Sequence, residues 1–239
     1  APPAAARQPR MLVGLVYNLK PPAAAGDSTI PSDIYAEWDD PNTIAAVRRA
    51  LEKCHNVVLI EAHGQARQNL IKSRPDIVFN LAEGASGVQR EAEIPALLES
   101  LDIPYTGSGP ATLSLCLDKA RTSRILNARG IPTARFALFA PGQAPAFDRF
   151  PAIVKPNWEG SSKGILNSSV LSDAADLSRE AARIWENYRQ PALVEEFLEG
   201  REFTVALLGN GPDLEALPIV EISLDCLPPS ARRIYSYEA

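Results

Sequence analysis

The stretch PAIVKPNWEGSSKGI, residues 151–165, places Lys155 at the end of a short apolar run and follows it with a loop rich in glycine and serine. A strand that only filled a core would not select a lysine. A lysine that leaves a strand beside such a loop is what a polyphosphate site requires, because its ammonium group and open backbone N–H groups both bind phosphate oxygens. A solvated lysine beside a surface turn is the alternative, and this stretch alone favours neither.

Two common nucleotide-binding motifs do not occur in the sequence. There is no G-x-x-x-x-G-K-[ST], so the loop is not a P-loop. No G-x-G-x-x-G follows the first predicted strand, which weakens a dinucleotide-binding interpretation.

Composition narrows the class of protein. Hydrophobic residues make up 46% of the 239 residues and charged residues 22%, which is ordinary for a soluble globular protein. The 29 acidic and 24 basic residues give a net charge of −5, so no nucleic-acid partner is predicted. No apolar run approaches the roughly 20 residues that a membrane helix needs, so no membrane partner is predicted either. Cys54, Cys116 and Cys226 fit neither a disulfide framework nor a zinc site, which favours a reducing cytoplasm.

The first half of the chain alternates strand and helix patterns. Residues 1–10 are rich in alanine and proline and are expected to be a disordered leader. Strands are predicted over 12–17, 57–61 and 76–81, and helices over 41–53 and 91–101. Strands separated by helices are typical of βαβ units, so we expect a doubly wound α/β domain.

The second half has a different pattern. A helix-rich stretch over 111–130 is stopped by Gly130 and Pro132. Strands are then predicted over 135–139, 152–156, 164–170, 192–197, 202–208 and 217–222, with one helix over 172–188 capped by Ser172 and Asp173. Because several strands follow one another directly, this half is expected to form an α+β lobe.

Acidic residues mark a possible hinge in VEEFLEGREF, residues 194–203. Glu195 could accept a hydrogen bond from an adenine amino group while the backbone near Leu198 meets the ring edge, and Glu202 could hold ribose hydroxyl groups. Lys119 in LDKARTSR supplies a second lysine. Each of these residues alone is more simply a solvated charge. Together with Lys155 and its loop they indicate one nucleotide site.

Five motifs in this order resemble the ATP-grasp enzymes of the D-alanine–D-alanine ligase group: PYTGSG, LDKARTSR with GIPT, IVKPNWEGSSKGI, LVEEFLEGREFTV and LPIVEI. The resemblance extends from about Val13 to the last residue. It implies an N-terminal α/β (pre-ATP-grasp) domain over 11–118 and a central ATP-binding lobe over 119–202. Residues 203–239 would be the beginning of an incomplete C-terminal ATP-grasp lobe.

The resemblance also assigns roles to individual residues. Lys119 and Lys155 match the lysines that contact ATP phosphates, and Lys155 and Ser161 are the expected catalytic residues. The mobile loop that covers the phosphates would be Glu159, Gly160, Ser161, Ser162, Lys163 and Gly164. Glu195, Glu196 and Leu198 match the adenine-binding hinge, and Glu202 matches the ribose ligand.

The reaction implied by the resemblance joins two amino acids through an acyl phosphate made from ATP, as in peptidoglycan biosynthesis. Magnesium is implied as well, with its ligands expected beyond residue 239 and none within this chain, so that these 239 residues alone should bind ATP weakly and form no amide bond. The expected partners are small-molecule amino-acid substrates, and a homodimer through the N-terminal domain is a further expectation.

Two departures from the family bear on the substrate. The segment YNLKPPAAAGDSTIPSDIYAEW, residues 17–38, lacks the family's Gly-Gly loop and the glutamate that grips the first substrate's ammonium group. AEGASGVQREAEIPALLE, residues 82–99, replaces a His-Gly-x-x-Gly-Glu-Asp-Gly segment. Glu83 and Gly84 are the expected substrate residues, with Arg90 and Glu91 in the same region.

Other functions therefore stay open. The chain could serve a ligase for another amino acid or a small peptide, or a nucleotide-binding regulator without ligase activity. An oxidoreductase that binds a dinucleotide at residues 107–109 is disfavoured, because PYTGSGP follows no clear strand.

Overall fold

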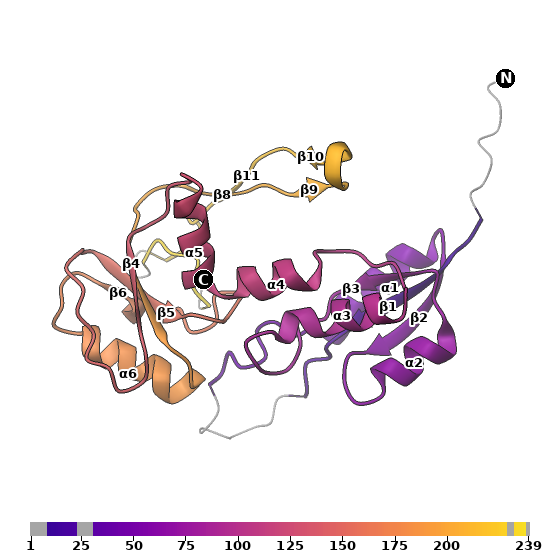
Figure 1. The fold of residues 1–239 in the computed structure, drawn as a ribbon, viewed down its shortest axis with the longest axis horizontal. Helices are drawn as coiled ribbons and strands as arrows, with labels where there is room; N and C mark the ends of the chain where they lie inside the picture. The colour runs from indigo at the N-terminus through magenta and orange to yellow at the C-terminus, as the bar shows by residue number, and fades with distance from the viewer. Residues whose placement is uncertain (1–8, 23–30, 229–231, 238–239) are drawn as a thin grey trace. The chain divides into compact units, whose positions relative to one another are not determined.

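The computed structural model describes residues 9–22, 31–228 and 232–237. The chain divides into two compact units, Ala1–Ile125 and Leu126–Ala239 (Figure 1). Most of the predicted leader, residues 1–8, lies outside the described residues. Each unit has its own hydrophobic core.

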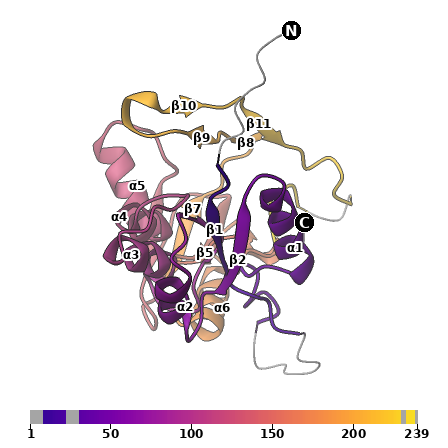
Figure 2. The ribbon, with the colours of Figure 1, turned by 90° about the vertical axis from the view of Figure 1, so that its right-hand side faces the viewer.

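The first unit is built on a parallel sheet in the order β2-β1-β3. Helices alternate with the strands, and Figure 2 shows α1 on one side of this sheet and α2 and α3 on the other, which is the doubly wound arrangement that the sequence predicts. The elements are β1 (Leu12–Tyr17), α1 (Pro41–Glu52), β2 (Asn56–Glu61), α2 (Ala66–Ser73), β3 (Ile77–Asn80), the 3₁₀ helix η1 (Arg90–Ala92) and α3 (Glu93–Ser100).

The core of the first unit lies between this sheet and helices α2 and α3. Val16, Ile60 and Val78, one from each strand, pack with Leu70 of α2 and Leu98 of α3. All five side chains are at most 1% exposed. Because every strand of a parallel sheet is buried between helices, its sequence reads as a continuous apolar run, as LVGLVY does.

The predicted helix-rich stretch over 111–130 is two helices, α4 (Pro110–Leu117) and α5 (Lys119–Ala128). The chain leaves helical geometry at Asp118, where φ is −82° and ψ is 92°. The Asp118 carboxylate accepts a hydrogen bond from the Arg121 N–H at 3.0 Å. An aspartate that bonds the first N–H groups of a helix starts that helix, which explains the break.

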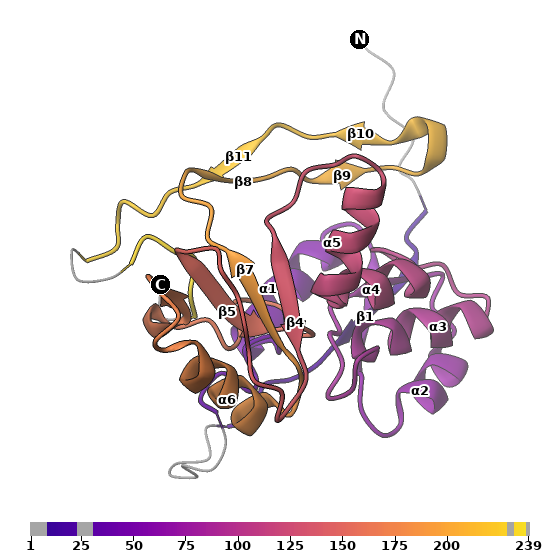
Figure 3. The same cartoon turned by 60° about the vertical axis from the view of Figure 1, so that its left-hand side comes forward.

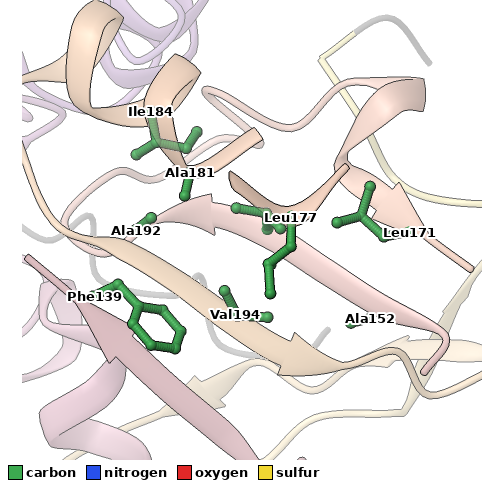
Figure 4. Packing of buried hydrophobic residues seen from close by; sticks show 9 residues of the cluster. Phe139, Ala152, Leu171, Leu177, Ala181, Ile184, Ala192 and Val194 are labelled. Carbon is green, nitrogen blue, oxygen red and sulfur yellow. The ribbon is translucent and has the colours of Figure 1, made fainter. Parts of the chain in front are cut away.

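The second unit is built on an antiparallel sheet in the order β4-β7-β5-β6, and Figure 3 shows β4, β7 and β5 side by side. Its strands are β4 (Phe136–Phe139), β5 (Ala152–Pro156), β6 (Val170–Leu171) and β7 (Ala192–Glu196). Helix α6 (Leu177–Tyr188) covers one face, where Ala152 and Val194 pack in one cluster with Leu177 and Ile184 (Figure 4). The opposite face carries the residues that alternate with this core, among them Lys155.

Beyond β7 the chain forms antiparallel two-stranded pairs that continue as one ribbon in Figure 3. Strand β8 (Glu202–Thr204) pairs with β11 (Val220–Ile222), and β9 (Leu207–Leu208) pairs with β10 (Glu215–Ala216) around the 3₁₀ helix η3 (Gly211–Asp213). The predicted strand over 202–208 is therefore split in two.

Three further predictions are corrected by the structure. Helix α6 begins at Leu177 instead of Ser172, because the Asp173 carboxylate caps a separate turn through the Ala175 N–H at 2.8 Å. The predicted strand over 164–170 is the 3₁₀ helix η2 (Asn167–Ser169), followed by the two residues of β6. The sequence predicts no helix between the strands over 57–61 and 76–81, whereas the structure has α2 there; its only buried residues are Ala66 and Leu70.

Candidate nucleotide-binding site

Strand register brings the first two site residues together. Strands β5 and β7 pair antiparallel with Ile153 opposite Glu195 and Lys155 opposite Leu193, so Lys155 and Glu195 are diagonal neighbours on one face. Lys155 Nζ lies 2.5 Å from Glu195 Oε2. The two side chains are only 19% and 14% exposed, so the pair is largely shielded from solvent. Ala152 and Val154 point to the α6 side, which leaves Lys155 on the open face.

A cavity of about 290 Å³ lies over this face of the sheet. Its polar lining comes from residues that the sequence singles out, namely Lys155, Glu195, Glu196 and Glu202, and Leu198 lines it as well. A second cavity of about 390 Å³ shares Phe197, Leu198 and Glu202 with it. Apolar walls with a few charged groups suit a ligand that has both a flat ring and a charged portion.

Five apolar residues and a tyrosine that line this cavity were not predicted from the sequence, among them Ala134. Ile153 precedes Lys155 by two positions, and the strand alternation that places Lys155 on this face could have identified it. Ile165 follows the glycine-rich stretch, and Phe197 lies between hinge residues. Ile234 and Tyr235 come from the last described segment, for which the sequence predicts no site residue.

The glycine loop, residues 158–165, is anchored at its base by a buried ion pair. Lys163 Nζ lies 2.8 Å from Glu159 Oε2, and the side chains are 7% and 10% exposed. The Gln190 amide donates to Glu159 Oε1 at 2.7 Å and accepts from the Trp158 N–H at 2.6 Å. The charges of Glu159 and Lys163 are thus directed at each other, and neither residue is among those that line the cavity.

The tip of the loop has unusual backbone geometry. Ser161 and Ser162 have φ angles of 46° and 57°, and Gly164 has φ of 78°. Non-glycine residues rarely adopt positive φ, and such conformations persist when neighbouring contacts hold them. Gly164 also lies so close to the Pro156 ring that a Cβ atom would collide with it. The tip exposes Ser161, as expected of a residue that meets a ligand.

Lys119 is the first residue of α5 and belongs to the first unit, whereas Lys155 and the hinge residues belong to the second. Its side chain is half-buried.

A second polar centre lies in the first unit, where β1 and β3 end. Asn18 is 1% exposed, and its Oδ1 accepts from the Glu83 and Gly84 N–H groups at 3.0 and 2.9 Å. Its Nδ2 lies 3.3 Å from His63 Nε2. A buried amide with partners on both ends fixes the loop that carries Glu83.

The segment over 17–38 contributes one glutamate, Glu37, to this centre. Glu37 forms a bidentate ion pair with Arg90, at 2.7 Å from Nη2 to each carboxylate oxygen, and the side chains are 4% and 5% exposed. Trp38 Nε1 donates to the Gly84 carbonyl at 3.0 Å. Gly84 packs against the Arg90 backbone with φ of 77°, a position that admits no larger residue without a shift. Sequence reasoning missed Glu37 because no local pattern connects it with Arg90.

Glu83 sits in an unfavourable electrostatic environment. Burial and then repulsion from Glu91 and Glu37 raise the pKa of Glu83 from 4.5 to about 7, although the Arg90 guanidinium acts in the opposite direction. A carboxyl group with a pKa near neutral can hold or release a proton at physiological pH.

Several known proteins resemble this chain in sequence. The family model for the D-ala D-ala ligase C-terminus matches residues 125–239. D-alanine–D-alanine ligase of Carboxydothermus hydrogenoformans is 36% identical over 205 residues, which cover 82% of this chain and 62% of that protein. The chain is a D-alanine–D-alanine ligase-like ATP-grasp protein. Protein y4sG of Sinorhizobium fredii is 36% identical over 197 residues, 78% of this chain and 57% of its own length. The chain thus spans about 60% of the length of the curated relatives it matches.

Solved structures agree on the fold. D-alanine–D-alanine ligase from Bacillus anthracis complexed with ATP superposes with a TM-score of 0.61 at 22% identity and covers 91% of this chain and 67% of that one. The Helicobacter pylori ligase gives 0.61 at 16% identity, with 93% and 77% covered. The described residues include no helix with the length and apolar character that crossing a membrane requires.

Proposed function

We propose that this chain carries the nucleotide-binding part of an ATP-dependent carboxylate–amine ligase that joins two amino acids, as D-alanine–D-alanine ligases do. One observation carries the proposal: Lys155, Glu195, Leu198 and Glu202, which are distributed over three elements, line one cavity. The family resemblance supports it, because the same positions match the family's phosphate, adenine and ribose ligands.

ATP would lie with its adenine ring against the apolar wall beside Leu198 and its amino group toward the Glu195 carboxylate. Glu202 would accept from the ribose hydroxyl groups. Lys155 would donate to a phosphate oxygen, which requires its ammonium group to share Glu195 with the nucleotide. Ser161 and the backbone of the glycine loop would cover the phosphates, and Lys119 would add a second positive charge.

The chemistry has two steps. A carboxylate oxygen of the first amino acid attacks the γ-phosphorus and ADP leaves, which gives an acyl phosphate. The amine nitrogen of the second amino acid attacks the acyl carbon, inorganic phosphate leaves, and the amine loses a proton. Lysine side chains and loop N–H groups assist both steps by neutralising charge on phosphate oxygens, so the contribution of this chain is positioning and electrostatic.

Magnesium is used by ligases of this kind together with ATP. Among residues 9–22, 31–228 and 232–237, no group of three or more His, Cys, Asp or Glu side chains is placed to hold a metal ion. We therefore assign no step to a metal bound by these residues.

The centre around Glu83 and Gly84 in the first unit is proposed to bind an amino-acid substrate. The carboxylates Glu83 and Glu91 are suited to a substrate ammonium group, whereas Glu37 is held by Arg90. Arg90 is already bonded on two sides by Glu37, so a substrate carboxylate would have to compete for it. This differs from the glutamate arrangement of the family and favours an amino acid or small peptide other than two D-alanines as an alternative substrate.

The test has two arms. Isothermal calorimetry measures ATP binding, and a coupled ADP-release assay with magnesium and a panel of amino acids that includes D-alanine measures ligation. Amino-acid-dependent ADP release together with formation of a dipeptide, detected by mass spectrometry, identifies a ligase. ATP binding without such release would instead support a nucleotide-binding regulator. No ATP binding at millimolar nucleotide would refute both.

A further inference from the structure

The glycine loop, residues 158–165, contacts the last described part of the chain. We name residues 232–237 the C-terminal segment. Three hydrogen bonds connect the loop and the turn after it to this segment: Ser162 Oγ donates to the Tyr235 carbonyl at 2.7 Å, the Tyr237 N–H donates to the Ile165 carbonyl at 3.1 Å, and the Arg232 N–H donates to Asn167 Oδ1 at 3.1 Å. The two stretches are thus joined at several points although some 70 residues separate them in sequence.

Packing strengthens this connection. Ile234 is 3% exposed and Ser236 is 7% exposed, so the C-terminal segment turns alternate side chains inward. Ile234 and Tyr235 line the same cavity as Ile165 and Lys155. The segment is therefore part of the wall of the cavity as well as a support for the loop.

Ser162 is the point at which the connection bears on the loop conformation. It follows Ser161, and both residues have positive φ. A side-chain hydrogen bond to a distant carbonyl is the kind of contact that holds such a conformation in place. The Ile165 N–H donates to the Ser162 carbonyl at 3.0 Å and the Lys163 N–H to the Gly160 carbonyl at 2.9 Å, so the turn also depends on Ser162 through the backbone.

The hydroxyl proton of Ser162 can be donated to only one acceptor at a time. It is committed to the Tyr235 carbonyl. A phosphate oxygen is an acceptor too, so Ser162 cannot donate to phosphate unless its hydrogen bond to the Tyr235 carbonyl breaks. Ser161 precedes Ser162 and is exposed, and the hydrogen bond to the Tyr235 carbonyl is made by Ser162 and not by Ser161.

We propose that Ser162 is a positioning residue that latches the glycine loop to the C-terminal segment, so that the loop is ordered before a nucleotide binds and the two stretches open together. Ser161 and the loop backbone, rather than the Ser162 hydroxyl, then meet the phosphates. The proposal rests on the proposed nucleotide site only for its effect on affinity, because the latch itself exists without ligand.

The latch is tested by amide hydrogen exchange of the whole chain without nucleotide. Two variants remove the hydroxyl in different ways: Ser162→Ala keeps a Cβ at positive φ, whereas Ser162→Gly also relieves the backbone strain. Exchange of the Lys163, Ile165 and Tyr237 amides should become roughly 2- to 10-fold faster in both, as expected for the loss of one hydrogen bond. Ser178→Ala, an exposed serine of α6, is the matched control.

The Tyr237 amide is the decisive readout. A purely local role of Ser162 would change exchange at Lys163 and Ile165 and leave Tyr237 as in the wild type. Because coupling is reciprocal, Ile234→Ala in the segment should also accelerate exchange at Lys163. Tyr237 exchange in Ser162→Gly equal to that of Ser178→Ala, or slower loop exchange in Ser162→Gly than in the wild type, would overturn the latch.

ATP affinity separates the latch from the proposed function. If both the latch and the nucleotide site exist, Ser162→Gly lowers ATP affinity by about the factor by which it accelerates amide exchange in the loop. The reason is that nucleotide binding must then supply the free energy that orders the loop. Faster exchange in a chain that binds no ATP would retain the latch and refute the nucleotide site. Unchanged exchange in a Ser162→Gly chain that binds ATP would refute the latch and retain the nucleotide site.

Discussion

Lys155 and Glu195 form an ion pair of 2.5 Å on the face of the second unit's sheet that helix α6 does not cover. Diagonal placement on two antiparallel strands gives this pair a fixed geometry, which an isolated surface lysine would not have. Both side chains line the cavity, so the pair is available to a ligand that offers an amino group to the carboxylate and a phosphate to the ammonium group.

Lys155→Ala should weaken ATP binding. A charge-assisted hydrogen bond contributes about 1.5–3 kcal/mol, so the dissociation constant should rise roughly 10- to 150-fold in calorimetry. Lys72→Ala, an exposed lysine on α2 of the first unit, is the control for the loss of one positive charge. Equal ATP affinity in the two variants would show that Lys155 is only a partner of Glu195.

The ion pair should also show measurable coupling in stability. In a double-mutant cycle of Lys155→Ala and Glu195→Ala, the double variant should be less destabilised than the sum of the single variants, by about 0.5–3 kcal/mol in urea unfolding. Each single variant leaves a shielded charge without its partner, which explains why the double variant is less destabilised than the sum of the two single variants. The exposed Arg48–Glu52 pair of α1, at 2.7 Å, provides a comparison with an expected coupling of about 0.3–0.5 kcal/mol. Equal coupling in both pairs would contradict the shielding of Lys155.

Gly164 should be among the least replaceable residues of the loop. Its φ of 78° disfavours any side chain, and an added Cβ would collide with the Pro156 ring. Gly130 has a similar φ of 74° but open space around it, so it reports the backbone cost alone. Gly164→Ala should therefore lower the free energy of unfolding by about 1–3 kcal/mol more than Gly130→Ala, since overpacking adds to strain. The measurement is urea unfolding of both variants, and equal losses would argue against close packing at Gly164.

The sequence predicts the strands of both cores well because the burial pattern is local. The bounds of β1 and β5 are those expected, since LVGLVY is continuously apolar and AIVKP alternates between two faces. Helix α2 escapes prediction because its buried face consists of Ala66 and Leu70 alone. The start of α6 was misplaced because Asp173 satisfies the usual cap composition while its carboxylate bonds a turn.

The candidate site is predictable to a lesser extent. Lys155 stands out because a charge in an apolar strand is uncommon, and Glu195 and Glu202 flank a hinge of recognisable composition. Pairs of residues that are distant in sequence leave no local pattern by which to predict them. The Glu37–Arg90 pair joins residues 53 positions apart, and the contact of Ser162 with Tyr235 spans 73 positions. Such pairs depend on the folded geometry and can be identified only from it.

The pH dependence of stability should reveal Glu83. Its pKa of about 7 in the folded protein lies above the ordinary value of 4.5, so the folded state binds a proton more tightly than the unfolded state does. The favourable contribution of protonated Glu83 is therefore fully present below pH 4.5 and is lost as the pH rises to about 7. Glu83→Gln mimics the protonated side chain at every pH. Its free energy of unfolding should match the wild type at the acidic end of this range and exceed it above pH 7. Urea unfolding at both ends measures the difference, and Glu93→Gln, an exposed glutamate of α3, gives the background effect of losing one carboxylate. A Glu83→Gln advantage that stays constant across the range would mean that burial and the neighbouring carboxylates do not raise the pKa of Glu83.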